Sequence, residues 1–220
     1  MTNFTRYLII IVASAAGVSG NAYAQDIPYA DINSIPLKEK AHTKMEGSPY
    51  LSDQFMKGTV VFKDGKIAKN INLNFDQING AVVFKNESDL EFTFVTPVKE
   101  FEIPLIGKFR SGFPPAKGTT ENTFFKVLND GKTQLLKTQK KAILETKAFY
   151  SGVVEKTVVE DVKYYILKPD NKPTILKNDK NSVLSALKDK ETELKKFIGK
   201  GFNFKNEADL ISLFDYYNTL

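Results

Sequence analysis

Alternation of apolar and polar residues with a period of two dominates residues 58–105 and restricts this segment to β-strands. In residues 67–75 the apolar side chains fall on one side of an extended chain and the asparagines on the other. The apolar set is Ile67, Ile71, Leu73 and Phe75, and the asparagine set is Asn70, Asn72 and Asn74. Successive side chains of a strand point to opposite faces, so this pattern predicts a strand with one buried and one solvated face.

Turn signals separate the alternating runs and predict antiparallel pairing. Asp64-Gly65, Asn79-Gly80 and Asp130-Gly131 each lie between two such runs, and tight hairpin turns need the positive φ that glycine adopts readily. Pro169-Asp170-Asn171 predicts a further turn of the same kind. Runs that recur about every ten residues are typical of a meander. We therefore expect a curved antiparallel meander or open half-barrel of about 8–10 strands.

The period changes to that of a helix in the last part of the chain, at about residues 180–218. Two apolar stripes recur at helical spacing, and Asn206 is placed to cap the second helix. The first stripe is Val183, Leu184, Leu187, Leu194, Phe197 and Ile198, and the second is Leu210, Ile211, Phe214 and Tyr217. An apolar sheet face is the available partner for both stripes. Residues 58–220 are thus expected to form a single β-rich domain of the α+β class, mainly β, with two C-terminal helices.

Residues 1–24 have the pattern of a secretory signal peptide. Arg6 precedes an apolar stretch that is shorter than the roughly 20 residues needed to cross a bilayer, and Ala22-Tyr23-Ala24 follows. We expect cleavage between Ala24 and Gln25, and hence secretion across the inner membrane to the periplasm or the cell surface. The chain contains no cysteine, which excludes a lipid anchor on cysteine, disulfides and thiolate chemistry.

Residues 25–57 are expected to form an extended N-terminal arm followed by a short helical turn. Ser48 can cap such a turn, and Pro49 suits its first position because a proline lacks the N–H that would be unpaired there. Three apolar side chains are expected to be buried anchors against the core: Tyr50, Leu51 and Phe55.

The charged residues argue against a nucleic-acid partner, and the single histidine argues against metal and catalytic sites built from histidine. Removal of Arg6 with the signal peptide lowers the formal net charge from +5 to +4 and leaves Arg110 as the single arginine. The lysines alternate with acidic residues, which is typical of a solvated surface and not of a nucleic-acid site, where arginine is favoured. His42 is the one histidine and lies in the polar arm, so histidine metal clusters and histidine-containing triads are not expected.

Two oxygen-rich sets are candidate sites. Asn72, Asn74 and Asp76 alternate as calcium ligands would, but the sixth place of an EF-hand loop requires glycine and here is Gln77. A half-buried strand accounts for the same alternation. The acidic set is Glu91, Glu100 and Glu102, which are expected on the polar faces of neighbouring strands, where two facing carboxylates could hydrolyse a glycoside.

Four segments of the chain resemble an uncharacterised family of secreted or periplasmic proteins of Gram-negative bacteria. They are GSPYLSDQFMKGTVVFKDGK (47–66), FFKVLNDGKTQLLK (124–137), YYILK (164–168) and DLISLFDYYN (209–218). The resemblance covers about residues 47–218. It implies an envelope location and a β-meander followed by C-terminal helices, and it transfers no catalytic residue.

The sequence favours a non-enzymatic binding or accessory module for an apolar ligand or an envelope protein partner. It contains no residues to which we assign a catalytic, cofactor-binding or metal-binding role. The alternative is a carboxylate-dependent hydrolase acting on envelope glycans. A cleft with two carboxylates about 5–9 Å apart would favour the hydrolase, whereas an apolar cavity or a bare strand edge would favour binding.

Overall fold

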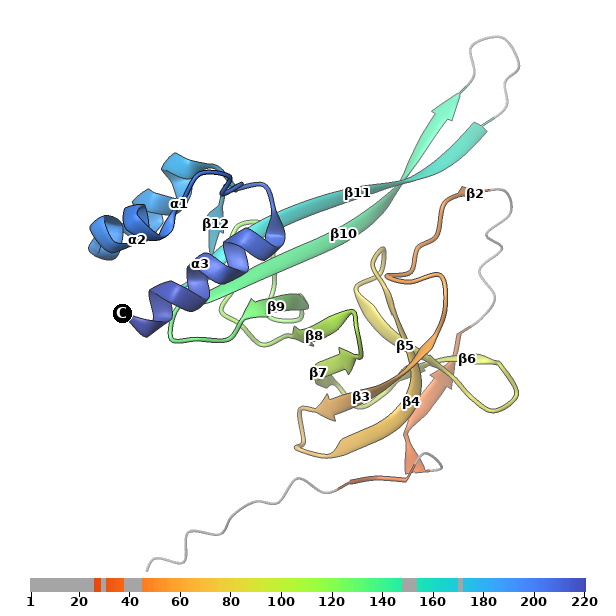
Figure 1. The fold of residues 1–220 in the computed structure, drawn as a ribbon. Helices are drawn as coiled ribbons and strands as arrows, with labels where there is room; N and C mark the ends of the chain where they lie inside the picture. The colour runs from red at the N-terminus through yellow and green to blue at the C-terminus, as the bar shows by residue number, and fades with distance from the viewer. Residues whose placement is uncertain (1–25, 29–30, 38–44, 148–153, 170–171) are drawn as a thin grey trace, which may run out of the picture.

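The computed structural model describes residues 26–28, 31–37, 45–147, 154–169 and 172–220. The described strands form one sheet in the order β1-β6-β5-β4-β3-β7-β8-β9-β10-β11-β12, with β2 beside β11 (Figure 1). The predicted fold class is confirmed: the protein is mainly β, with an open antiparallel sheet and C-terminal helices. The predicted cleavage residues Ala22, Ala24 and Gln25, and also His42, lie outside the described residues.

The sheet has twelve described strands, more than the 8–10 expected. They are β1 (Ser34–Pro36), β2 (Met45–Glu46), β3 (Met56–Phe62), β4 (Ile67–Asp76), β5 (Ala81–Lys85), β6 (Glu91–Phe94), β7 (Val98–Ile103), β8 (Gly107–Arg110), β9 (Phe125–Asn129), β10 (Gln134–Lys147), β11 (Val154–Leu167) and β12 (Thr174–Leu176). The N-terminal arm accounts for the difference, because it supplies β1 beside β6 and β2 beside β11. All pairs are antiparallel except that of β2 with β11.

The first part of the sheet is curled, and the chain connectivity explains why. β6 and β7 follow each other in the chain, but β5, β4 and β3 separate them in the sheet. In a flat sheet the two strands would be roughly 19 Å apart, whereas residues 95–97 let the chain reach only about 14 Å. The sheet therefore bends until β6 approaches β7, and the rings of Phe62 on β3 and Phe94 on β6 lie 5.4 Å apart.

Phenylalanine side chains fill the concave face of this curled part. Phe101 on β7 stacks on Phe109 of β8 at 4.7 Å between ring centroids, and Phe75 of β4 lies 5.3 Å from Phe101. The buried members of this phenylalanine core are Val60, Phe62, Ala68, Ile71, Leu73, Phe75, Val82, Phe84, Phe101, Ile103 and Phe109. The concave face is therefore a packed core, and side chains occupy the place where an apolar ligand was expected.

The predicted faces of β4 are wrong at two positions. Asn70 has a φ of 60° and forms a bulge opposite the segment from Gly58 to Val60, which reverses the alternation. Ala68 therefore pairs with Val60 in the core, and Ile67 is only half-buried. Asn74, which was expected in solvent, is buried because its side chain bonds to the backbone of the segment before β3.

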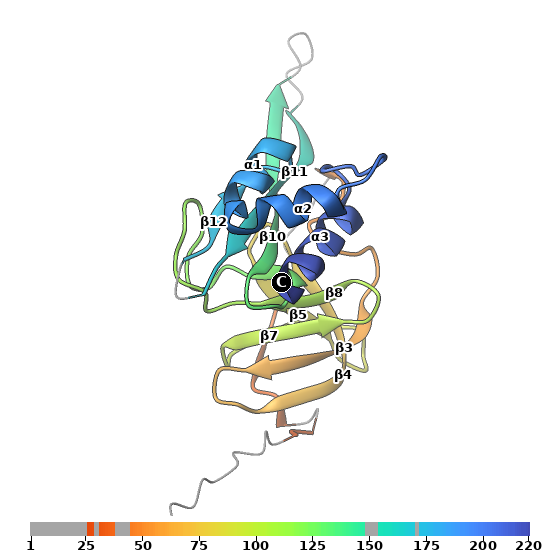
Figure 2. The same ribbon diagram turned by 60° about the vertical axis from the view of Figure 1, so that its left-hand side comes forward.

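Three helices cover one face of the sheet at its β9–β12 end (Figure 2). They are α1 (Lys180–Ala186), α2 (Glu191–Phe197) and α3 (Glu207–Thr219), with a short 3₁₀ turn at Lys188–Lys190 between α1 and α2. The first of the two predicted helices is thus divided. Asp189 in the turn accepts a hydrogen bond from the Tyr217 hydroxyl of α3 and pairs with Lys168 at 3.6 Å. These contacts hold the turn against distant parts of the chain.

α3 belongs to the core. Leu210, Leu213 and Phe214 are fully buried, and Asn206 caps the helix as predicted by accepting a hydrogen bond from the Asp209 amide at 3.1 Å. The helix-covered core contains the buried residues Leu135, Ile166, Leu176, Val183, Leu184, Leu187, Leu194, Leu210, Leu213 and Phe214. A smaller, separate core cluster consists of the buried side chains of Phe125, Leu136 and Tyr165.

Asn218 joins the end of α3 to the β9–β10 hairpin. Its side-chain nitrogen donates to Asn129 Oδ1 and to the Thr133 carbonyl, both at 2.9 Å, and its oxygen accepts from the Thr133 amide at 2.9 Å. The hairpin at Asp130-Gly131 is confirmed, but Gly131 is not among the residues with positive φ. Glycine is needed there for space, because an added Cβ would lie 2.3 Å from the Asn218 side-chain nitrogen.

We expect Gly131→Ala to lower the free energy of unfolding by about 1–3 kcal/mol, since the new methyl group would displace Asn218 from its partly buried hydrogen bonds. Gly199→Ala is the matched control, because a Cβ at Gly199 would meet no atom within 4 Å. Urea denaturation of both variants measures the difference. Equal stability of the two variants would show that the Asn218 contacts contribute nothing.

Candidate functional site

The segment before β3 does not form the predicted helical turn. Tyr50 instead forms a β-bridge with Asp76, and the Leu51 amide donates to the Phe75 carbonyl at 2.9 Å. These bonds to the distant strand β4 replace the local backbone bonds of a helical turn. The sequence predicted that Tyr50, Leu51 and Phe55 are buried anchors, and this prediction is wrong because all three are only half-buried. Leu51 nevertheless packs on the phenylalanine core. Phe55 contacts Tyr50 and the Lys85 ammonium at the surface.

The candidate calcium ligands have structural roles. The Asn74 side chain donates to the Ser52 carbonyl at 2.8 Å, and Asp76 accepts from the amides of Ile78 and Asn79 at 3.0 and 2.9 Å. These contacts close the β4–β5 turn and hold the segment before β3. Among the described residues, no three histidine, cysteine or acidic side chains lie together as a metal site would require.

The acidic candidates do not sit on neighbouring strands as predicted, because Glu91 is on β6 and Glu100 and Glu102 are on β7. Glu91 accepts a hydrogen bond from the Tyr50 hydroxyl at 2.5 Å. Burial, and next the bond to Glu91, raise the pKa of Tyr50. The sequence pattern failed here because it could not reveal that β3, β4 and β5 lie between β6 and β7.

Glu100 belongs to an ion network on the sheet surface. Arg110 Nε lies 2.8 Å from Glu100, and its two terminal nitrogens bind Asp130 at 3.1 and 2.9 Å. The hydrogen bond from Arg110 lowers the pKa of Asp130. Glu100 is thus held in ion pairs with Arg110 and Lys108. None of the hydrolase candidates Glu91, Glu100 and Glu102 lines either of the two hollows described below.

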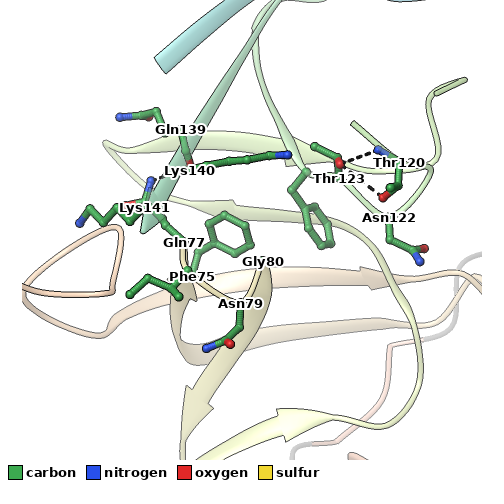
Figure 3. Close-up of a pocket in the computed structure, with 12 residues that line it drawn as sticks. Phe75, Gln77, Asn79, Gly80, Thr120, Asn122, Thr123, Gln139, Lys140 and Lys141 are labelled. Carbon is green, nitrogen blue, oxygen red and sulfur yellow. Dashed lines mark hydrogen bonds between the residues drawn. The ribbon is translucent and has the colours of Figure 1, made fainter. Parts of the chain in front are cut away.

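A cleft of about 290 Å³ lies where three segments meet: the β4–β5 turn, the loop before β9 and the middle of β10 (Figure 3). The lining residues are Phe75, Gln77, Ile78, Asn79, Gly80, Thr120, Asn122, Thr123, Phe124, Gln139, Lys140 and Lys141. A second hollow of about 330 Å³ shares Gly80, Asn122 and Phe124 with the first. We call the two hollows together the polar cleft.

Gln77 fixes one wall of the polar cleft. It is 4% exposed, and its side chain donates to the Gln139 carbonyl of β10 at 3.1 Å. Its own carbonyl accepts from the Lys141 amide at 3.1 Å, and its amide donates to the Pro49 carbonyl at 2.9 Å. The β4–β5 turn is thereby bonded to β10, so the curled part of the sheet and the long hairpin hold the cleft between them.

The opposite wall is the loop before β9. Thr120 and Thr123 bond to each other in a tight turn, in which the Thr120 amide donates to Thr123 Oγ1 at 2.9 Å. Lys140 reaches across to this loop and donates to the Gly118 carbonyl at 2.7 Å. Lys63, which directly follows β3, lines the second hollow and donates to Asn122 Oδ1 at 3.3 Å. No sequence motif indicated this cleft, because its walls come from segments that are distant in the chain.

A long β-hairpin projects from the body of the protein (Figure 1). β10 and β11 pair over their full 14 residues each. We call the outer half, residues 142–147 and 154–159, the hairpin arm. Its exposed large apolar residues are Ile143, Leu144, Val154 and Val159. Ile143 lies opposite Val158 on one face of the arm, and Leu144 lies opposite Thr157 on the other.

One edge of the hairpin arm has no neighbouring strand among the described residues. The Lys141 amide points away from β11, since it donates to Gln77. Hydrogen-bonding direction alternates along a strand, so the N–H and C=O groups of Ile143 and Glu145 point to the same outer edge. β9 pairs with β10 only as far as Lys137. The pattern of residues 141–159 is ambiguous and favours a strand that ends near Tyr150. The described part of this segment is strand, at the end of β10 and the start of β11.

Glu207, the first residue of α3, is the centre of a half-buried ion cluster. It accepts from Lys137 at 2.7 Å and from the Tyr164 hydroxyl at 3.1 Å, and Lys126 lies 3.7 Å away. Burial raises the pKa of Glu207, but Lys137, Lys126 and Tyr164 together outweigh burial and hold this pKa below its usual value. Burial, followed by the Glu207 charge, raises the pKa of Tyr164 to about 12.

A lowered carboxyl pKa stabilises the folded protein above the ordinary value of 4.5, and this stabilisation is lost as the pH falls through the lowered pKa. We expect Glu207→Gln to cost about 1–3 kcal/mol at pH 7, because the Lys137 ammonium loses its partner. The stability difference between Glu207→Gln and the wild type should shrink towards pH 3, because Glu207 itself becomes protonated as the pH falls. Urea unfolding at a series of pH values measures it, with Glu87→Gln at an exposed position as control. A pH-independent loss would contradict the ionic role of Glu207.

The fold and these features define an α+β protein with an open, partly curled sheet, a helical layer and a projecting hairpin. Comparison with family models, curated proteins and solved structures finds no match for the chain. None of the helices in the described part of the chain has the length and apolar character needed to span a membrane.

Proposed function

We propose that this protein is a non-enzymatic binding module of the cell envelope that engages a partner protein through the hairpin arm. The observation that carries the proposal is the exposure of apolar side chains on both faces of the arm, with Leu144 53% exposed. Among the described residues, the two-residue strand β2 is the one further strand that pairs with the arm, and so narrow a ribbon gains little stability of its own in water. A surface of this kind is typical of sites that other proteins cover.

The free edge of β10 supports strand addition as the mode of binding. An extended segment of a partner can pair with the outward N–H and C=O groups of Ile143 and Glu145, as in other complexes that add a strand to a sheet edge. Main-chain bonds would supply affinity, and the side chains of Ile143 and Leu144 would supply contacts on opposite faces. Glu145 is already paired with Lys156 across the hairpin at 2.9 Å, so its charge does not oppose an apolar segment.

The envelope location rests on the signal-peptide pattern of residues 1–24. N-terminal sequencing of the protein from its native envelope is expected to begin at Gln25. A protein that begins at Met1 and stays in the cytoplasm would contradict this part of the proposal while leaving the binding role of the arm open to its own test.

The binding role is tested with a photo-crosslinking amino acid at position 144 in native cells, and with the same amino acid at position 90 as control. Leu90 is 60% exposed and stands just before β6, a strand that pairs with neither β10 nor β11. We expect one discrete adduct from position 144 and none from position 90. Ile143→Pro should abolish the adduct without changing the unfolding midpoint, because the lost N–H points outward. No adduct, or an adduct unaffected by Ile143→Pro, would refute strand addition at this edge.

A further inference from the structure

The polar cleft has a lining whose chemistry points to a ligand, and it is separate from the hairpin arm. Six of the residues that line its first hollow carry neutral amide or hydroxyl groups: Gln77, Asn79, Thr120, Asn122, Thr123 and Gln139. Amide and hydroxyl side chains can both donate and accept hydrogen bonds. Part of this capacity is used within the protein, because Gln77 donates to the Gln139 carbonyl, Asn79 to Asp76 and Gln139 to Glu160. Phe75, Ile78 and Phe124 supply an apolar part of the wall. Polar groups that both donate and accept, beside an apolar surface, match a sugar with its hydroxyl groups and C–H faces.

The charge of the cleft is positive. Lys140 and Lys141 line the first hollow and Lys63 the second, and neither lining contains an acidic residue. Lys140 donates to the Gly118 carbonyl and Lys63 to Asn122 Oδ1, so both bond to neutral oxygens. An ammonium group has three donors, which leaves further donors on each lysine for a ligand. A concave site lined by one sign of charge concentrates counter-charged ligands.

The carboxylates nearest the cleft do not line it, but two of them bond to side chains of the lining. Glu160 accepts from the Gln139 side chain at 3.1 Å, and Asp76 accepts from the Asn79 side chain. Glu121, between Thr120 and Asn122 in the chain, is exposed and lines neither hollow. Asp76, which adjoins the lining, accepts hydrogen bonds from the Ile78 and Asn79 amides of its own turn. Asp161 lies opposite Lys140 in the hairpin register and is bound by Lys163. Lys141 directs its ammonium to the carbonyls of Ser48 and Tyr50 and so fixes the wall instead of facing a ligand. Lys140 and Lys63 are therefore the two lysines placed to attract an anion.

We propose that the polar cleft binds a small polyhydroxylated anion, namely a sugar that carries a carboxylate or a phosphate group. Asn122, Gly80 and Phe124 belong to both hollows, so a ligand can occupy one hollow with its sugar body and extend towards the second. At about 290 and 330 Å³ the hollows are at the lower end of ligand pockets, which suits one sugar unit in each. The amides select the hydroxylated body, and Lys140 and Lys63 select its charge.

The test is an NMR titration of the isotope-labelled mature chain, residues 25–220, with four probes: glucuronate, glucose 6-phosphate, glucose and inorganic phosphate. We expect one or both charged sugars to shift the amide signals of Gly80, Thr120 and Asn122, with a Kd at least tenfold below that of glucose. Binding of only one charged sugar identifies the anionic group. Lys140→Gln should weaken binding of the charged sugars about tenfold, whereas Lys177→Gln at an exposed distant position should leave it unchanged.

Four outcomes would overturn the proposal. Glucose that binds as tightly as the charged sugars would make the site one for neutral ligands. Inorganic phosphate that binds as tightly as glucose 6-phosphate would leave an adventitious ion only. Shifts confined to signals outside the cleft, or no shift with any probe, would remove the site altogether. Unchanged affinity in Lys140→Gln would remove the charge selection, and a retained unfolding midpoint would show that this variant is folded.

Discussion

Deletion of residues 206–220 is expected to leave a chain that aggregates and has no cooperative thermal transition. α3 buries Leu210, Leu213 and Phe214 completely, and each such side chain contributes about 1.5–3 kcal/mol by burial. Their sum, roughly 5–9 kcal/mol, is comparable to the whole net stability of a domain. The deletion also removes Glu207 and Asn218, which bond α3 to β9, β10 and β11. The apolar sheet face beneath would then be open to solvent.

Calorimetry and size-exclusion chromatography of the truncated and full mature chains measure this effect. A soluble monomer with an unchanged midpoint would contradict the core role of α3. Because a truncated chain can fail for general reasons, two point variants accompany it. Leu213→Ala should cost about 2–5 kcal/mol, whereas Ser212→Ala, at the exposed neighbouring position, should be nearly neutral.

Phe101→Ala is expected to lower the free energy of unfolding by about 3–5 kcal/mol, the usual loss for a large buried side chain. Phe101 is 0% exposed, and its ring contacts those of Phe75, Phe109 and Phe124 at 5.3, 4.7 and 5.2 Å. The backbone hydrogen bonds of β7 to β3 and β8 hold these strands in place. The strands cannot move into the space that the Phe101 ring would leave, so a cavity remains. Urea denaturation followed by circular dichroism measures the change.

Phe197→Ala is the matched control for Phe101→Ala. Phe197 is 39% exposed and stacks on Tyr216 at the helical surface, so its loss should cost about 1 kcal/mol. Similar losses for the two variants would mean that the concave face is loosely packed. In that case the apolar cavity that the sequence suggested, and with it an apolar ligand, would again have to be considered.

The sequence alone determined the parts of this fold that depend on local periodicity. Residues 67–75 alternate with a period of two and form β4, and the apolar stripe of residues 210–217 forms α3 with Asn206 as its cap. Asp64-Gly65 and Asn79-Gly80 mark hairpins, with Gly65 and Gly80 at positive φ as expected. Period and turn chemistry act between near neighbours, so they can be recognised without any knowledge of the tertiary contacts.

Only the tertiary structure decided where these elements lie and what they form together. β7 pairs with β3 instead of β6, which separates Glu91 from Glu100 and curls the sheet around its phenylalanine core. Asn70 at positive φ shifts one face of β4, and a 3₁₀ turn at Lys188–Lys190 divides the predicted helix. The polar cleft joins residues 75–80, 120–124 and 139–141. These features depend on long-range pairing, whose free energy comes from packing and desolvation between distant segments and leaves no periodic signal in the sequence.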